Sequence, residues 1–278
     1  MSSAQSDAFY VMGQSQAEQE RLIAQSGFFA PATRRLLVEA GLTTGMRVLD
    51  VGCGVGDVSL LCAELVGPTG SVVGVDRDEA AVARAEERVG GLGYAHVTFR
   101  AGDFRTLDHD EPFDAVVGRL VLMYQADPVA AVRSLLPRLR PGGVVAFHEM
   151  ESSVDLALPA SPTYHRFIGW WNALAEKAGL RRNMGLELYG TLAAAGVQAP
   201  RVHVEAFAGG GSDFAGYQYI GASAKGLLPA LLRFGIATEE EVGADTLAER
   251  IRDEVVSSGG CMTMQLLFGA WGRVPADT

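Results

Sequence analysis

The chain has 278 residues, of which 48% are hydrophobic, so it can bury the core of one large domain with additional cap segments. Its net charge of −10, without a block of basic residues, argues against a nucleic-acid partner. The sequence contains no apolar run of membrane-spanning length, its N-terminus is polar, and its three cysteines lack metal-ligand spacing. We therefore expect a cytoplasmic protein without a metal that acts on a small molecule.

The first 30 residues read as an N-terminal arm with a polar helix over residues 15–25. Two interpretations stay open for this arm. It either packs as a solvated helix on the domain, or it acts as a lid that brings Tyr10 and Met12 against a bound ligand. A second helix is predicted from Pro31 to Ala40, because proline favours the first turn of a helix.

A glycine-rich turn follows the first predicted strand, Arg47 to Val51. Gly52, Gly54 and Gly56 alternate with other residues, and a helical pattern begins directly after them. In α/β sheets a strand, a tight glycine turn and a helix form a nucleotide site, because glycines let the backbone approach the ligand and the helix N-terminus offers free N–H groups.

The acids around this turn do not suit a dinucleotide. Asp57 stands where the dinucleotide fingerprint has its last glycine, and Asp50 lies where a pyrophosphate would approach. An acid at this place suits a cationic ligand better. A nicotinamide-dependent oxidoreductase is therefore the less favoured interpretation.

Four more strands alternate with helices up to residue 150, which predicts a doubly wound, mostly parallel sheet. Asp76 ends the second strand 20 residues after Gly56, where an acid in this architecture reaches ribose hydroxyls. The remaining predicted elements are strands 97–104, 113–119 and 144–149, with helices 78–89 and 128–139.

The regular alternation ends at Met150. Beyond it we predict helices over 164–179, 185–195, 227–234 and 238–257, and strands over 201–207 and 262–274. We divide the chain into an N-terminal arm (1–30), a nucleotide-binding core (31–150), and a third part (151–278). The third part carries the last strands of the core and two helical cap insertions, at about 151–185 and 209–260.

The run from Asp50 to Gly56 resembles the first motif of Rossmann-like S-adenosylmethionine-dependent methyltransferases. Later features keep the same order and spacing, namely Asp76, Asp103, Arg119 and the turn from Leu139 to Val144. The resemblance covers about residues 30–150. It implies a seven-stranded sheet of order 3-2-1-4-5-7-6 with an antiparallel seventh strand, and S-adenosylmethionine as cofactor without a metal.

The resemblance also implies which residues contact the cofactor. The glycines would hold its methionine part with Asp50 near the ammonium, Asp76 would accept from the ribose hydroxyls, and Asp103 would accept from the adenine amino group. Apart from the resemblance, these residues also have structural interpretations: Asp76 could cap a helix, Asp103 could close a loop, and Arg119 could form a structural ion pair. The full expected set is Tyr10, Met12, Asp50, Gly52, Cys53, Gly54, Gly56, Asp76, Arg77, Gly102, Asp103, Phe104, Arg119 and Leu120.

Methyl transfer from a sulfonium depends first on positioning, and it can require removal of a proton. His148 and Glu149 end the fifth strand, and strand alternation lets only one of them face the site. His148 is a candidate general base, and Glu149 could instead bind a substrate amine or hydroxyl. Either residue could also merely bond a loop.

We expect a small apolar or aromatic metabolite, methylated at oxygen, nitrogen or carbon in specialised metabolism. The aromatic side chains that could line its pocket are Tyr124, Trp170, Trp171, Tyr217 and Tyr219. Alternatives are a lyase or cyclase that uses the same cofactor, and a binding module without catalysis. A homodimer stays open.

Overall fold

The computed structural model describes residues 16–106, 111–152 and 161–276, with side chains from residue 27 onward. Tyr10 and Met12 lie outside these residues, so the predicted contact of the arm with a ligand stays a prediction.

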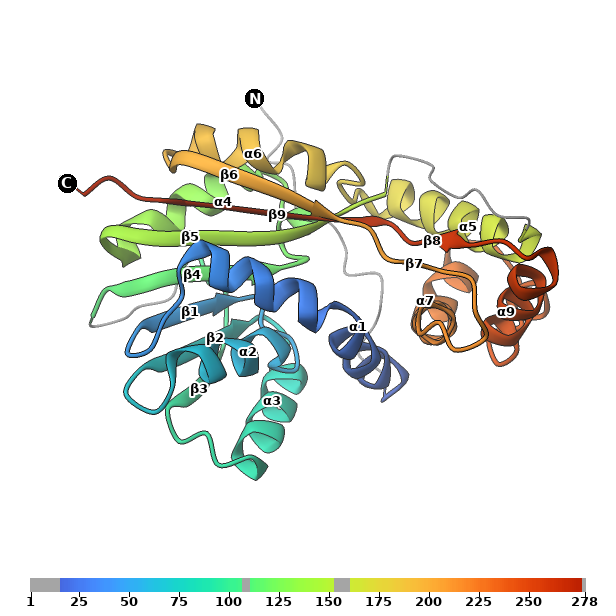
Figure 1. The fold of residues 1–278 in the computed structure, drawn as a ribbon, viewed down its shortest axis with the longest axis horizontal. Coiled ribbons are helices and arrows are strands. Elements are labelled where there is room, and N and C mark those ends of the chain that lie inside the picture. The colour runs from blue at the N-terminus through green and yellow to red at the C-terminus, as the bar shows by residue number, and fades with distance from the viewer. Residues whose placement is uncertain (1–15, 107–110, 153–160, 277–278) are drawn as a thin grey trace.

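The main sheet has seven strands in the order β3-β2-β1-β4-β5-β9-β6 (Figure 1). β9 runs antiparallel to both of its neighbours, and the other strand pairs are parallel. Because β6 and β9 are the sixth and seventh strands of this sheet along the chain, the predicted order and the antiparallel last strand are confirmed. The strands are β1 Arg47–Val51, β2 Ser71–Asp76, β3 Val97–Ala101, β4 Phe113–Arg119, β5 Leu139–Glu151, β6 Gln198–Glu205 and β9 Leu266–Arg273.

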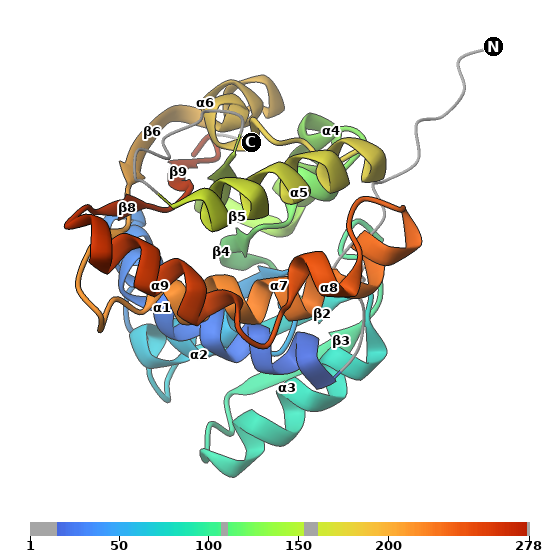
Figure 2. The same ribbon diagram turned by 90° about the vertical axis from the view of Figure 1, so that its right-hand side faces the viewer.

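Helices cover both faces of the sheet. On β9 a Cβ at Gly269 would lie 2.9 Å from Leu36 of α1, whereas the adjacent Phe268 lies against Gly185 of α6. Since successive strand residues point to opposite faces, α1 and α6 lie on opposite sides. α2 and α3 lie on the same side of the sheet as α1, and α4 lies on the side of α6 (Figure 2). The bounds are α1 Gln16–Ala40, α2 Asp57–Val66, α3 Glu79–Gly91, α4 Pro128–Leu135 and α6 Met184–Ala195, with the short turns η1 Leu122–Tyr124 and η2 Leu136–Arg138.

A mostly helical cap lies beyond the carboxyl end of β5, on the right in Figure 1. It also contains a two-stranded sheet of β7 and β8, which the sequence did not indicate. The parallel strands end towards this cap, so it stands over the edge of the sheet where open α/β folds bind ligands. The cap elements are α5 Pro162–Ala178, β7 Ala208–Gly209, α7 Gly216–Arg233, α8 Glu239–Val242, α9 Leu247–Ser258 and β8 Met262–Thr263.

The two predicted N-terminal helices are one continuous helix, α1, with Pro31 inside it. The prediction of a break at Pro31 was wrong because tertiary packing outweighs the local penalty of a proline. Phe28 stacks on Tyr219 with ring centroids 5.4 Å apart, and Phe29 packs on Phe207 at 5.3 Å, so the turn before Pro31 is fixed by the cap.

Other boundaries also differ from the sequence prediction. The helix predicted over 227–234 begins at Gly216, and the one predicted over 238–257 is divided into α8 and α9. Gly243 adopts a left-handed conformation with φ of 49° and ends α8. β5 begins at Leu139 rather than Val144, because Leu139 pairs with Phe113 across a register shift.

Among the residues that the structure describes, no helix is both long and apolar enough to cross a membrane.

Candidate active site

The glycine turn between β1 and α2 is built from three left-handed residues, with φ of 63° at Gly52, 52° at Gly54 and 85° at Gly56. A Cβ at Gly52 would lie 2.5 Å from Val121, and one at Gly56 would lie 3.0 Å from Phe99. A Cβ at Gly54 would meet no described atom within 4 Å. Gly52 and Gly56 therefore serve packing, whereas Gly54 presents its backbone to open space where a ligand can approach.

Asp76 ties the glycine turn to β2. The backbone N–H groups of Gly54 and Asp78 donate to its two carboxylate oxygens at 2.8 and 3.0 Å. Burial raises the pKa of Asp76, and these hydrogen bonds act in the opposite direction. The N-cap of α3 is Asp78, which accepts from Ala80 N–H, so the structure does not support the N-cap interpretation of Asp76.

Asp50 is fully buried behind the turn. Ser59 Oγ donates to its Oδ2 at 2.6 Å, and its Oδ1 has no hydrogen-bond partner within the described part of the chain. Burial raises the pKa of Asp50 to about 7, against the opposing effects of the Ser59 hydrogen bond and the Arg119 charge. Cys53, buried in the same turn, donates its backbone N–H to Val75 O.

Arg119 ends β4 and joins three elements. Its Nη1 donates to Thr33 Oγ1 of α1 at 3.2 Å, and its Nη2 lies 3.7 Å from an oxygen of Asp57 at the start of α2. Arg88 of α3 donates to the other oxygen of Asp57 at 3.0 Å. The structural ion pair that we considered for Arg119 is therefore present, and it holds the first turn of α2.

Asp103 follows β3 and is shared by two arginines, Arg77 at 2.9 Å and Arg105 at 2.7 Å. Burial alone would raise the pKa of Asp103, but the hydrogen bonds from Arg105 and the charge of Arg77 lower it to about 2. The carboxylate is thus ionised at neutral pH. Beside it, Gly102 donates to Asp76 O at 2.8 Å, and Phe104 is buried in the main hydrophobic cluster.

The segment after β4 has an unusual backbone. Leu120 has a left-handed φ of 57°, rare for a residue with a Cβ, and its N–H donates to His148 O. Glu149 then accepts from the N–H groups of Val121 and Leu122, both at 2.8 Å, and of Met123 at 3.3 Å. Strained backbone held by several contacts is typical of functional sites.

His148 and Glu149 point to opposite sides, as the strand alternation predicted. His148 Nδ1 lies 3.2 Å from Thr33 Oγ1 under α1, and its Nε2 has no partner among the described residues. Burial lowers the pKa of His148 well below its usual range, aided by the charge of Arg119, so the ring is neutral near pH 7. Burial raises the pKa of Glu149 to about 7. The catalytic roles of both residues stay predictions.

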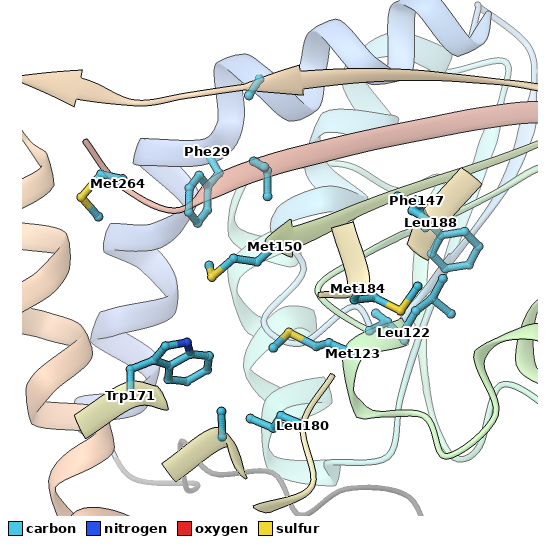
Figure 3. Packing of buried hydrophobic residues seen from close by; sticks show 14 of the residues in the cluster. Phe29, Leu122, Met123, Phe147, Met150, Trp171, Leu180, Met184, Leu188 and Met264 are labelled. Atoms are coloured by element: carbon cyan, nitrogen blue, oxygen red, sulfur yellow. The ribbon is translucent and has the colours of Figure 1, made fainter. Parts of the chain in front are cut away.

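The aromatic residues predicted for the pocket all belong to the main hydrophobic cluster or pack against it, and their contact with a substrate stays a prediction. Trp171 of α5 is buried and joins Met123, Met150 and Phe29 in the hydrophobic cluster (Figure 3). Trp170 is half-buried beside it, and Tyr124 lies in η1. Tyr217 packs edge to face on Phe214 at 5.4 Å inside the cap, and Tyr219 stacks on Phe28.

Sequence reasoning missed four residues of this region: Thr33, Val121, Met123 and Met150. Thr33 meets His148 across 115 positions of sequence, and no local pattern signals such a contact. Met123 follows β4 and Met150 lies near the end of β5, at the edge of the sheet where open α/β folds bind ligands, and that position was the available signal. Within the described ranges, no group of three or more histidine, cysteine, aspartate or glutamate side chains is arranged to hold a metal ion.

The order of the sheet, its antiparallel seventh strand and the glycine turn after β1 define a Rossmann-like fold. The chain belongs to the methyltransferase family: a family model described as a methyltransferase domain matches residues 42–180, which is half of the chain.

Curated relatives match somewhat less than half of the chain. The chain is 36% identical over 129 residues to an arsenite methyltransferase of Aquipseudomonas alcaligenes, which covers 44% of this chain and 37% of the relative. It is 35% identical over 125 residues to a 2-phytyl-1,4-naphtoquinone methyltransferase of Synechococcus elongatus, with 44% and 51% covered. The chain thus spans about half, or less, of the length of these relatives.

Solved structures share the fold over more of the chain. A phosphoethanolamine N-methyltransferase 2 of Haemonchus contortus, in complex with S-adenosyl-L-methionine, matches with a TM-score of 0.56 at 18% identity, covering 88% of this chain and 52% of the other. The [4+2]-cyclase SpnF matches with a TM-score of 0.51 at 22% identity, covering 98% and 87%.

Proposed function

We propose that this protein is an S-adenosylmethionine-dependent methyltransferase that acts on a small apolar or aromatic molecule. The observation that carries the proposal is Gly54, whose backbone faces open space between the carboxyl ends of β1 and β2 while its neighbours in the turn are packed. Membership of the methyltransferase family supports the same assignment.

The residues around this opening suit the cofactor. Asp76 ends β2, and its carboxylate can accept hydrogen bonds from ribose hydroxyls. Asp103 follows β3, and its carboxylate can accept a hydrogen bond from an amino group. Asp50 has one carboxylate oxygen without a partner among the described residues, which suits a cationic group near the turn. The cofactor supplies a methyl group already activated by a positive sulfur, so the protein mainly has to bind and orient.

The segment after β4 provides the orientation. Glu149 fixes the backbone of residues 121–123 through its carboxylate, and we assign it this positioning role. His148 keeps a neutral imidazole whose Nε2 has no partner within the described ranges, so it is the group that we propose for accepting a proton where the substrate releases one.

The substrate class follows from the cap. The hydrophobic cluster continues from the ends of β4 and β5 into α5 and α7 without a break, so a molecule bound there meets apolar surface. The named naphthoquinone methyltransferase is consistent with such a substrate. We also propose a cytoplasmic, metal-independent enzyme of specialised metabolism, and the division into arm, core and capped third part given above, in which the arm either packs on the domain or acts as a lid.

A cyclase or lyase that binds the same cofactor is the second candidate. The fold shared with the [4+2]-cyclase SpnF supports this second candidate, because the same fold hosts different reactions. A product in which a methyl group has replaced a hydrogen of the substrate identifies a transferase, whereas a product without an added methyl group identifies the second candidate.

Thermal unfolding with S-adenosylmethionine, S-adenosylhomocysteine and NAD in parallel tests the cofactor. A ligand present at about 100 times its dissociation constant stabilises the folded state by roughly 2.7 kcal/mol. We expect the first two to raise the midpoint and NAD to leave it unchanged. Stabilisation by NAD alone, or by none of the three, would contradict the proposal.

A further inference from the structure

Five segments of the chain bring apolar side chains to the carboxyl ends of β4 and β5. Met123 follows β4, Met150 lies near the end of β5, and Trp171 comes from α5 of the cap. Phe29 of α1 and Met264, after β8, belong to the same cluster. Figure 3 shows these side chains directed towards one another between the sheet and the cap.

Arg181, just after α5, holds the cap side chains of this lining in a fixed position relative to those of the core. Its backbone N–H donates to Met123 O at 3.1 Å, and its guanidinium donates to Gln125 O and Ala126 O at 3.3 and 2.9 Å. The position of Trp171 relative to Met123 is therefore set by backbone contacts between cap and core.

The lining is rich in thioether side chains. Met123, Met150, Met184 and Met264 all belong to the buried cluster, and each is at most 7% exposed. Methionine is unbranched and polarisable, so it adapts to the outline of a ligand and packs well against aromatic rings.

Trp171 adds one polar group to this apolar lining. The side chain is 7% exposed, and its Nε1 has no hydrogen-bond partner among the residues that the structure describes. A buried indole N–H ordinarily finds an acceptor. In Figure 3 the indole nitrogen lies on the side of the ring that faces Met150, so the donor points into the lining rather than out to solvent.

We propose that Trp171 is a specificity-determining residue, and that its indole N–H donates a hydrogen bond to a carbonyl oxygen of a neutral, flat aromatic substrate. The proposal rests on the proposed function and narrows its substrate class to aromatic ketones and quinones. An acceptor is required because Nε1–H can only donate. A neutral ligand is required because the rest of the lining is apolar and would leave a charge unpaired.

A matched pair of ligands tests this assignment. 9-Fluorenone and fluorene have nearly the same shape, and only the ketone offers an acceptor oxygen. Their dissociation constants are measured by equilibrium dialysis with S-adenosylhomocysteine present, on the wild-type chain and on Trp171→Phe, which removes the N–H and keeps an aromatic ring. Fluorenone also avoids the addition of thiols that a quinone would undergo at the exposed Cys261.

We expect the wild type to bind fluorenone about tenfold more tightly than fluorene, and Trp171→Phe to bind both equally. Trp271→Phe, on β9 and packed against a separate hydrophobic cluster, is the control and should retain the wild-type ratio. A packing role of Trp171 alone would weaken both ligands together and leave the ratio unchanged, which would overturn the proposal.

Two other outcomes are informative. If S-adenosylhomocysteine stabilises the protein but neither fluorenone nor fluorene binds, the proposal for Trp171 is overturned while the proposed function stands. If S-adenosylhomocysteine does not stabilise the protein, the proposed function itself fails, and the specificity proposal, which rests on it, is overturned with it.

Discussion

Gly54 and Gly56 lie two residues apart in the same turn, yet their surroundings differ. Both have a left-handed φ, so a side chain at either position strains the backbone by about 1 kcal/mol or more. At Gly56 a Cβ would additionally contact Phe99 at 3.0 Å and Ala85 at 3.2 Å. At Gly54 it would enter the open space assigned to the cofactor.

We therefore predict opposite main effects for the two alanine variants. Gly56→Ala should destabilise the fold by about 2–4 kcal/mol. Gly54→Ala should cost about 1 kcal/mol in stability and weaken S-adenosylhomocysteine binding at least tenfold. Urea denaturation and calorimetric titration measure the two quantities. Unchanged cofactor affinity in Gly54→Ala would show that the ligand does not approach this glycine.

Glu149 makes the stability of the protein depend on pH. Burial raises its pKa from 4.5 to about 7, so between these values the folded state keeps a proton that the unfolded state releases. Stability from this group is therefore fully present below about pH 4.5 and is lost as pH rises to about 7, by about 3 kcal/mol in total. Asp50 acts in the same direction.

Glu149→Gln should therefore flatten the dependence of unfolding free energy on pH between 5 and 7, measured by urea denaturation at three pH values. Its side-chain carbonyl can still accept from Val121 and Leu122, whereas its NH₂ would face the N–H of Met123. Glu240→Gln, on the exposed surface of α8, serves as control and should keep the wild-type slope. An unchanged slope in Glu149→Gln would refute the assignment.

At the scale of elements, α1 carries a proline that its packing tolerates but its backbone does not favour. Pro31 is exposed and cannot donate to the carbonyl of Gly27 one turn earlier. Replacement by alanine restores that donor and removes the steric conflict, against a smaller loss from the more flexible unfolded chain.

Pro31→Ala should consequently stabilise the protein by about 1–2 kcal/mol, visible as a raised thermal midpoint. Pro162→Ala is the matched control, because Pro162 is also exposed but stands at the first position of α5, where proline is favourable. It should give no gain. Equal effects of the two substitutions would mean that the interior position of Pro31 carries no penalty.

At the scale of the whole molecule, core and cap share one hydrophobic cluster, from Val73 of β2 to Ile251 of α9. We therefore expect one cooperative unfolding transition. Arg181 holds the two parts together through three backbone carbonyls, two by its side chain and one by its own N–H. Loss of its side chain should weaken this coupling more than the stability of either part.

The variant Trp271→Phe makes the coupling between core and cap measurable. Its remaining tryptophans, Trp170 and Trp171, both lie in α5, so its fluorescence reports on the cap. Its fluorescence and far-ultraviolet circular dichroism should give the same urea midpoint. Adding Arg181→Met should move the fluorescence midpoint to lower urea than the dichroism midpoint. The added substitution Lys177→Met, at an exposed position of α5, should not separate them. Coincident transitions in the Arg181 variant would argue against its role in coupling.

The sequence by itself determined the alternation of strands and helices and the place of the glycine turn, and its resemblance to a methyltransferase family implied the sheet order and the antiparallel last strand. Strand and helix periodicity and glycine spacing are local signals, so the chain shows them without its tertiary structure. Only the tertiary structure decided that α1 continues through Pro31, that Glu149 holds the segment after β4, and that His148 lies under Thr33. It also decided that Gly54 faces open space and that the N–H of Trp171 is left without a partner in the described chain. Each of these depends on contacts between segments far apart in the sequence, which no local pattern encodes.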